Sequence, residues 1–245
     1  MAHRKILLLV LISLLIISCN SLWVPRHIKQ SFTNCYDGKN TGLDTLISVV
    51  GYYRMWQEYD RYGINAVYEH QLDTIYSYFL LYPDGIIVDF FSSGGKNVDD
   101  LINDIISTSN RGKKHSFFSY NNWGCYSIKG DTIISQNVNH ARSLNQYYGG
   151  YEKKYKIIDK NTLLLIEHRS LSKIPPLSTI ELGYQEQRER ERDFENAFDR
   201  KSIISDTANF IPLKEIPPSD CWLKEKRWFW CDKEKFKKWK SGVKY

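Results

Sequence analysis

The pattern of apolar and polar positions is dominated by short strand-like runs separated by tight turns. β-branched and aromatic residues fill the runs, and Gly, Pro, Asp and Asn mark the turns. Pro83-Asp84-Gly85 is one such turn, because Pro presets φ and Gly accepts a positive φ. The pattern predicts three β-hairpins: residues 74–82 with 85–91, 125–129 with 132–138, and 155–158 with 162–168. With a further run at 45–55, the hairpins predict a mainly β protein with peripheral helices, built as an antiparallel meander.

Two segments between and after the hairpins have the apolar spacing of helices. Asn97 is expected to cap a helix over residues 98–107, whose apolar side chains recur on one face. Residues 184–201 are rich in helix formers and place Phe194 and Phe198 four positions apart. We interpret this second segment as a solvated helix docked through its two phenylalanine rings, with a movable lid as the alternative.

The chain divides into four segments by composition. Residues 1–18 form an apolar leader, and residues 19–42 are polar with scattered Gly and Pro, which is typical of a tether. Residues 43–175 hold the meander and are the predicted β domain. After Pro175-Pro176 the composition changes, and residues 176–245 are predicted to be a helical and aromatic extension packed on that domain.

The leader has a basic start and a short apolar run. Arg4 and Lys5 precede residues 6–17, which are apolar apart from Ser13. A membrane-spanning helix needs roughly 20 apolar residues, and this run has only 12. The leader is therefore interpreted as a secretory signal rather than a retained transmembrane anchor.

The leader ends with a small residue directly before a cysteine. This sequence, Ile16-Ile17-Ser18-Cys19, resembles the lipobox of bacterial lipoproteins. The resemblance implies cleavage between Ser18 and Cys19, diacylglycerol on the Cys19 thiol, and a fatty acyl group such as palmitate on the new amino terminus. Ordinary signal cleavage beside a chance cysteine is the alternative.

Lipidation would make the membrane a partner of this protein and the cell envelope its location. Three acyl chains on Cys19 would anchor it permanently, because two already hold a protein stably at a bilayer. Asn20 and Ser21 give no sign of the inner-membrane retention signal of some lipoproteins, which uses an Asp after the cysteine. We therefore expect the outer membrane of a Gram-negative bacterium.

The basic excess of the chain is concentrated in its tail. The chain has 34 Lys and Arg against 28 Asp and Glu, and loss of Arg4 and Lys5 with the leader leaves a net charge of +4. Residues 224–244 alone carry a local net charge of +6, so the rest of the mature chain sums to about −2. Because the chain as a whole is not basic, a nucleic-acid partner is not expected. Asp232 is predicted to cap a short helix in this tail, with Phe236 and Trp239 on one face. The tail rings are expected to complete the core, with contact to anionic lipid headgroups as the alternative.

Four cysteines remain besides Cys19. They are Cys35, Cys125, Cys221 and Cys231. An even number in an exported protein permits two disulfides in three possible connectivities. We expect Cys221–Cys231, which closes a short loop, together with Cys35–Cys125; four reduced and buried thiols are the alternative. None of the four forms a CxxC pair, so a zinc or redox motif is not indicated.

The chain contains none of the common sequence motifs for catalysis or cofactor binding. A nucleophile elbow, a P-loop, a dinucleotide fingerprint and HExxH are all missing from the sequence. Asp99-Asp100 lies at a predicted helix start, where the helix dipole favours acidic side chains. We expect no catalytic residue, no metal and no cofactor.

Three stretches of the predicted meander resemble small lipocalin-like lipoproteins of Gram-negative bacteria. They are Gly51-Tyr52-Tyr53, the Leu-Tyr-Pro-Asp-Gly of residues 81–85 and the Trp-Gly-Cys-Tyr-Ser-Ile-Lys-Gly-Asp-Thr-Ile of residues 123–133. The resemblance covers residues 46–169, about half of the chain. It implies an antiparallel barrel or a strongly curved sheet, in some members with a ligand cavity.

Aromatic side chains are the candidates for ligand contact. The chain has 17 Tyr and 7 Trp, and such rings suit sheet faces and interfaces with one wet end. The candidates on the first two predicted strands are Tyr52, Tyr53, Tyr76, Tyr78 and Tyr82.

Three classes of function are compatible with the sequence. The first is a non-enzymatic, membrane-anchored binder of a small ligand or of a partner protein. The second is a hydrolase acting on glycans or envelope components. The third is a structural subunit of an envelope complex. The lipobox, the aromatic meander and the lack of catalytic motifs favour the binder.

Overall fold

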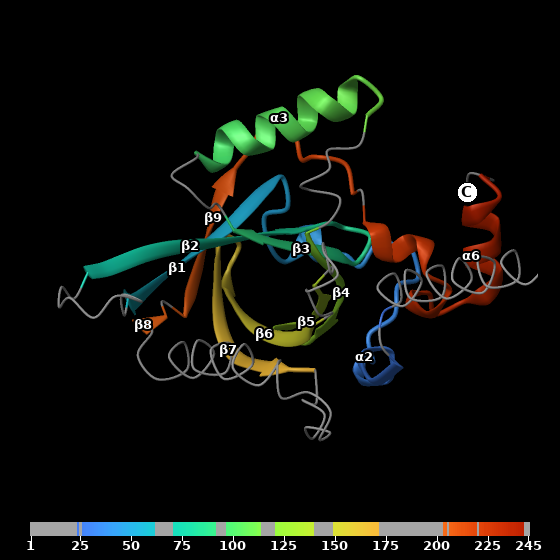
Figure 1. Cartoon of the computed structure of the whole chain (residues 1–245), viewed down its shortest axis with the longest axis horizontal. Helices are drawn as coiled ribbons and strands as arrows, with labels where there is room; N and C mark the ends of the chain where they lie inside the picture. Colours follow the sequence, from blue (N-terminus) through green and yellow to red (C-terminus); the bar gives the residue numbers. More distant parts are fainter. Residues whose placement is uncertain are drawn as a thin grey trace, which may run out of the picture.

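A closed barrel of eight antiparallel strands forms the centre of the molecule (Figure 1). The structure is a computed structural model that describes residues 24, 26–61, 71–91, 97–113, 121–139, 149–171, 203–204, 206–219 and 221–242. The strands are β1 (Gly51–Arg61), β2 (Gln71–Leu81), β3 (Ile86–Phe91), β4 (Asn122–Lys129), β5 (Thr132–Val138), β6 (Gly150–Asp159), β7 (Thr162–Ser170) and β9 (Thr207–Pro212). Neighbours pair in chain order, and the short β8 (Ile203–Ile204) adds to β1. The predicted fold class, a mainly β meander that forms a lipocalin-like barrel, is confirmed.

The three predicted hairpins are β2–β3, β4–β5 and β6–β7. Gly85 and Gly130 have positive φ angles of 90° and 59°, which explains glycine at these two turns. All three turns lie at the same end of the barrel, which we call the turn end. The other end, where β1, β3, β5 and β7 finish, is called the rim end.

Strand β9 closes the barrel between β7 and β1. Ala208 lies opposite Leu163 of β7, and Phe210 lies opposite Tyr53 of β1. The β domain therefore extends beyond the predicted boundary at residue 175. Of the six residues of β9, only Ala208 and Phe210 join or contact the inner cluster. Two apolar positions are too few to predict a strand from the alternation of apolar and polar residues.

Two apolar clusters lie on the two faces of the barrel wall. The inner cluster draws side chains from all eight strands and is closed at the turn end by Leu43 and Ile47. Leu43 begins the 3₁₀ helix η1 (Leu43–Thr45), and the segment is held there because Ser48 N donates to the Lys160 carbonyl at 2.7 Å. The outer cluster lies between the wall and the segments that cover it.

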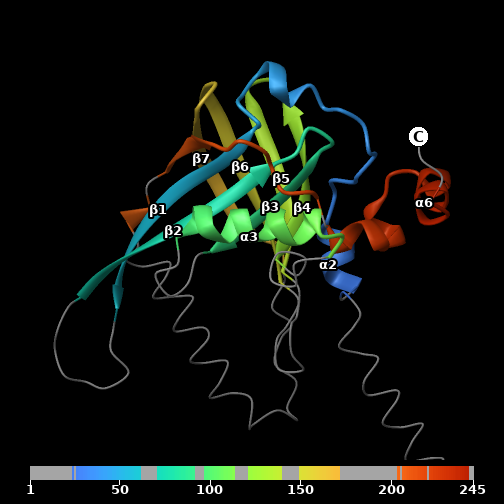
Figure 2. The same cartoon turned by 90° about the horizontal axis from the view of Figure 1, so that it is seen from above.

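Helix α3 (Val98–Asn110) covers part of the outer face of the barrel (Figure 2). Its cap is confirmed, because the Asn97 side chain accepts a hydrogen bond from Asp99 N at 3.1 Å. Val98, Ile102 and Ile105 are buried against the wall, as the helical spacing predicts. The predicted helix over residues 184–201 lies outside the described residues, as do the leader and Cys19.

The carboxy-terminal residues form two 3₁₀ turns and a helix. The turns are η2 (Trp222–Glu225) and η3 (Arg227–Phe229), and the helix is α6 (Lys233–Lys240). The Asp232 side chain accepts from Glu234 N at 2.7 Å, so this predicted cap is also confirmed. Trp222, Leu223, Phe229 and Trp230 are buried in the outer cluster, as expected if the tail rings complete the core.

Among the described residues, the predicted tether packs against the barrel from Val24 onward. It contains helix α2 (Arg26–Ser31), and Ile28, Phe32 and Tyr36 are buried in the outer cluster. A parallel bridge joins Tyr36 to Trp230, with Tyr36 N donating to the Phe229 carbonyl at 2.8 Å. The apolar residues of this segment are few and widely spaced among polar ones, so the sequence pattern does not predict that they are buried.

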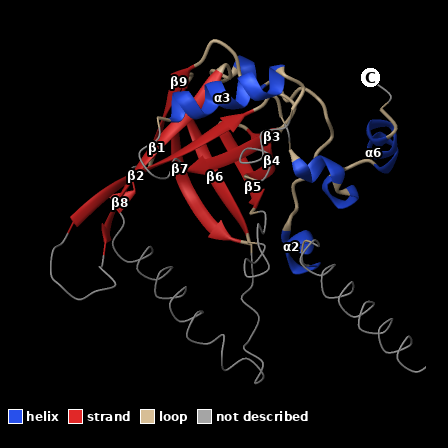
Figure 3. Cartoon of the chain, turned by 45° about the horizontal axis from the view of Figure 1, so that its top comes forward, coloured by secondary structure: helices blue, strands red, loops and turns tan. Residues whose placement is uncertain are grey.

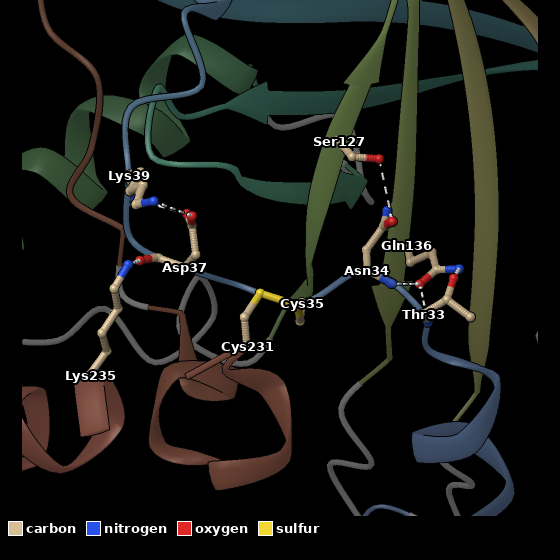
Figure 4. The surroundings of a disulfide bond; sticks show 9 residues. All are labelled: Thr33, Asn34, Cys35, Asp37, Lys39, Ser127, Gln136, Cys231 and Lys235. Atoms are coloured by element: carbon tan, nitrogen blue, oxygen red, sulfur yellow. Dashed lines mark hydrogen bonds and ion pairs between the residues drawn. A yellow bond between two sulfur atoms is a disulfide. The ribbon is translucent and has the colours of Figure 1, made fainter. Parts of the chain in front are cut away.

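The disulfide joins Cys35 to Cys231, so both predicted pairings are wrong (Figure 4). Cys125 and Cys221 are instead free thiols buried in the outer cluster. The bridge between Tyr36 and Trp230 brings the two oxidised cysteines together, although 196 positions separate them in the chain. The preference for the pairing that closes a short loop is wrong here, because the two cysteines are brought within bonding distance by the folding of distant segments.

Candidate functional site

The barrel interior is divided along its axis into an apolar half and a polar half. At the turn end the rings of Tyr53, Phe79 and Tyr155 stack in sequence, with centroids 5.3 and 4.9 Å apart. Other apolar side chains complete this layer: Leu43, Ile47, Leu81, Ile87, Tyr126, Ile133 and Leu163. The turn-end half is therefore a packed core.

The rim-end half of the same interior carries polar side chains. Alternation along the strands and their register direct these residues inward: Ser77 of β2, Asp89 of β3, Ser135 and Asn137 of β5, and Tyr151 and Lys153 of β6. For example, Asp89 lies opposite the core residue Phe79, and Ser135 lies opposite Lys153. Because directly opposed residues share a face of the sheet, Asp89 and Lys153 both point into the barrel.

A buried ion pair is the centre of this polar half. Lys153 Nζ lies 2.6 Å from Asp89 Oδ2, and the two side chains are 10% and 4% exposed. The Tyr151 hydroxyl donates to the same oxygen at 3.0 Å. Two charges withdrawn from water are tolerated when they are paired and hydrogen-bonded, as Asp89 Oδ2 is here.

Several buried polar atoms around the ion pair have no hydrogen-bond partner among the described residues. They are Asp89 Oδ1, Ser77 Oγ, Asn137 Oδ1 and the Tyr155 hydroxyl. All four residues are less than 9% exposed. Buried polar atoms in folded proteins are normally paired with protein, water or ligand, and each unpaired one costs about 1–3 kcal/mol. Four of them in one half of one barrel make this half the candidate site.

Two tyrosines close to Asp89, Tyr151 of the polar half and Tyr155 of the packed core, are held in their neutral form. Burial, and then the nearby Asp89 carboxylate, raise the pKa of Tyr151 and Tyr155 well above the ordinary value. A neutral phenol can both donate and accept a hydrogen bond, and the Tyr155 hydroxyl is available for either role. The site thus offers one hydroxyl on β2, one phenol on β6, and acceptor oxygens on β3 and β5.

The aromatic residues predicted to contact a ligand are not gathered at this site. Tyr53 lies inside the barrel but belongs to the packed core at the turn end. Tyr52, Tyr78 and Tyr82 lie in the outer cluster, where the Tyr52 hydroxyl donates to Asp99 Oδ1 at 3.0 Å. Tyr76 is 41% exposed, with the Arg54 guanidinium 5.3 Å from its ring centroid.

The residues of the polar half were missed at the level of sequence, although a signal existed. Asp89 is the one charged residue in the apolar run Ile-Ile-Val-Asp-Phe-Phe of β3. Lys153 alternates with Tyr151 and Tyr155 on the same face of β6. The strand predicted from the sequence begins only at residue 155, so it does not include Lys153. A charged residue at an inward position was the observation that could have located the site.

The described part of the chain lacks two other kinds of site. In it, no three or more His, Cys, Asp and Glu side chains come together to hold a metal ion. None of its helices combines the length and the apolar character required to cross a bilayer.

The fold and this site define the class of the protein: an eight-stranded lipocalin-like barrel with a polar rim-end interior. Comparison with family models, curated proteins and solved structures finds no match for the chain.

Proposed function

We propose that this protein is a membrane-anchored binding protein whose small ligand occupies the polar, rim-end half of the barrel. One observation carries the proposal: the part of the barrel that holds the Asp89–Lys153 pair contains four buried polar atoms, one of them on Asp89 itself, that lack partners among the described residues. A barrel that served only as a scaffold would gain stability from apolar side chains in these positions. Polar groups kept there at a cost are typical of ligand sites.

The anchor in this proposal is the lipid on Cys19, supported by the lipobox that ends the leader. A protein held permanently at a membrane needs no affinity of its own for the bilayer. The barrel would then serve as a receptor or carrier for a molecule of the cell envelope.

The test removes single ligand-facing atoms without disturbing the fold. Ser77→Ala and Tyr155→Phe each delete an oxygen that has no partner among the described residues, so the melting temperature of the empty protein should stay the same or rise. Ser127→Ala is the matched control, because Ser127 Oγ bonds Asn34 Oδ1 at 3.4 Å on the outer face.

Mass spectrometry of molecules that co-purify with detergent-extracted protein provides the readout. The wild type and the Ser127→Ala variant should carry the same molecule, and the two interior variants should carry less of it or none. If all four proteins carry the same molecules in equal amounts, or none at all, the proposed binding function is wrong.

A further inference from the structure

We infer that the exposed side of helix α6 docks on the anionic headgroups of the bilayer and holds one side of the barrel against the membrane. The inference rests on the lipid anchor of the proposed function and is independent of the ligand in the barrel. A lipid on Cys19 keeps the protein at the membrane but does not fix which side of the barrel faces it. A second contact is needed for that, and α6 has the chemistry to make it.

The rings and the exposed lysines of α6 have different surroundings. Phe236 is buried, and the Trp230 ring lies 6.1 Å from the ring of Phe236 and 5.7 Å from that of Trp239. These contacts attach the helix to the outer cluster. The exposed side carries four of the five lysines of the helix: Lys233, Lys237, Lys238 and Lys240. The two interpretations of the tail that the sequence allows, core packing and headgroup contact, are therefore compatible in one helix.

Acidic side chains compensate little of this positive charge. The helix has one acid, Glu234, which pairs with Lys237 at 2.8 Å. Among the described residues, Lys233, Lys238 and Lys240 take part in no ion pair. Their three ammonium groups lie along a helix of only about 12 Å. A surface of lipid phosphates has the opposite charge and attracts such a cluster.

An open hollow lies beside the same helix. It has a volume of about 380 Å³, and the described residues that line it are Glu225, Trp239 and Lys240. The Trp239 side chain is 37% exposed, although its ring contacts Trp230. Tryptophan favours the interface between membrane and water, because its indole has a large apolar body and one polar N–H. Trp239 can thus enter the headgroup layer together with the lysines.

The anchor segment brings this side of the barrel to the bilayer. Helices α2 and α6 lie on the same side of the barrel (Figure 3), and Lys235 of α6 donates to the Asp37 carbonyl at 2.9 Å. Val24 is buried in the same outer cluster as Phe236. Only five Cα–Cα steps separate Val24 from Cys19, which span at most about 18 Å when fully extended. Because so short a tether gives α6 a high local concentration of headgroups, a weak interaction of each lysine is enough for docking.

Lysine labelling of the lipidated chain in vesicles tests this inference. The vesicles contain phosphatidylcholine alone or an equal mixture with phosphatidylglycerol, and an amine-reactive reagent is added in limiting amount. Mass spectrometry then gives the labelling rate of each lysine. Labelling of Lys233, Lys238 and Lys240 should be several-fold slower in the anionic vesicles and should recover at high salt, which screens the attraction. Lys160, an exposed lysine in the turn between β6 and β7, should be labelled equally in both vesicles.

A pair of charge variants separates a local surface from the net charge of the chain. The double variant Lys233→Glu with Lys238→Glu should lose the protection of Lys240 in anionic vesicles. The control, Lys129→Glu with Lys160→Glu, changes the net charge by the same amount at the turn end and should keep this protection. All four substituted side chains are exposed, so both proteins should keep their melting temperature.

Equal labelling of the α6 lysines in the two kinds of vesicle, or loss of protection in both double variants, would overturn the docking surface. Protection in isolated cell envelopes but not in anionic vesicles would overturn the lipid as the partner in favour of an acidic macromolecule. Release of the protein from both kinds of vesicle would contradict the anchor, and with it the basis of the inference. None of these outcomes depends on the barrel ligand, so the proposed binding function is tested separately.

Discussion

At the scale of single residues, the Asp89–Lys153 pair combines a structural and a binding role. It lies inside the barrel in the polar half, where Asp89 is directly opposite the core residue Phe79. Its members neutralise each other, so neither charge depends on a ligand, and one carboxylate oxygen remains available.

Removing one partner of this pair should be far more costly than removing an exposed ion pair. In the Lys153→Met variant the Asp89 carboxylate stays buried without its partner, and we expect the free energy of unfolding to fall by about 3–5 kcal/mol. In the control, Lys237→Met, the pair with Glu234 is about 70% exposed, and the loss should stay below about 1 kcal/mol. Urea denaturation measures both. Similar losses in the two variants would show that the interior pair is solvated.

The free thiols provide a second prediction at this scale. Burial raises the pKa of Cys221 to about 12 and that of Cys125 well above the ordinary value. At pH 8 only about one Cys221 thiol in ten thousand is a thiolate, the form that reacts. Iodoacetamide should therefore leave both cysteines unmodified in the native protein at pH 8 and label both in urea. Rapid labelling of either thiol in the native protein would contradict their burial.

At the scale of elements, close approach between strands fixes glycine at one position of β4. A Cβ on Gly124 would overlap the backbone carbonyl of Gln136 on β5. The Gly124→Ala variant should therefore lose about 1–3 kcal/mol of stability by overpacking. In the Gly149→Ala control the nearest atom is the side-chain amide of Asn139 at 3.3 Å, so the thermal midpoint should hardly change. An unchanged midpoint in both variants would mean that β4 and β5 can separate locally.

The disulfide links the amino- and carboxy-terminal segments on the barrel wall. Closing a loop of 196 positions should stabilise the fold by about 2–5 kcal/mol, mainly by restricting the unfolded chain. A reducing agent should lower the thermal midpoint of the wild type. It should have no effect on the double variant Cys35→Ser with Cys231→Ser, because Cys125 and Cys221 are already reduced. A double variant that still responds to the reducing agent would indicate another disulfide.

The elements that the sequence predicts well are those with local causes. The three hairpins, the Asn97 cap and the Asp232 cap depend on residues within a few positions of each other. Strand β9, the packing of Ile28 and the Cys35–Cys231 bridge depend on contacts between distant segments, for which no local pattern exists. The polar half of the interior is predictable only in part. The sequence shows which residues of a strand share a face, but it does not show that the strands close into a barrel with this face inside.

At the scale of the whole molecule, the proposed anchor makes attachment separable from folding. The barrel strands lie between Gly51 and Pro212, far from Cys19 in the chain, so the Cys19→Ala variant should keep its melting temperature. It should lose the lipid and remain uncleaved by the lipoprotein peptidase. Intact-mass measurement and detergent partitioning check this outcome. An unaltered mass with unchanged partitioning would exclude the lipobox interpretation.

The disulfide also determines how mechanical force passes through the protein. A pull between Cys19 and the carboxy terminus travels along residues 19–35, crosses the Cys35–Cys231 bond and leaves through α6. All eight barrel strands lie within the covalent loop and carry none of this load. Stretching should therefore extend only the short segments outside the loop, whereas after reduction the loop would release about 700 Å of chain. A barrel held between a membrane and a load at its carboxy terminus is thus protected from tension by one covalent bond.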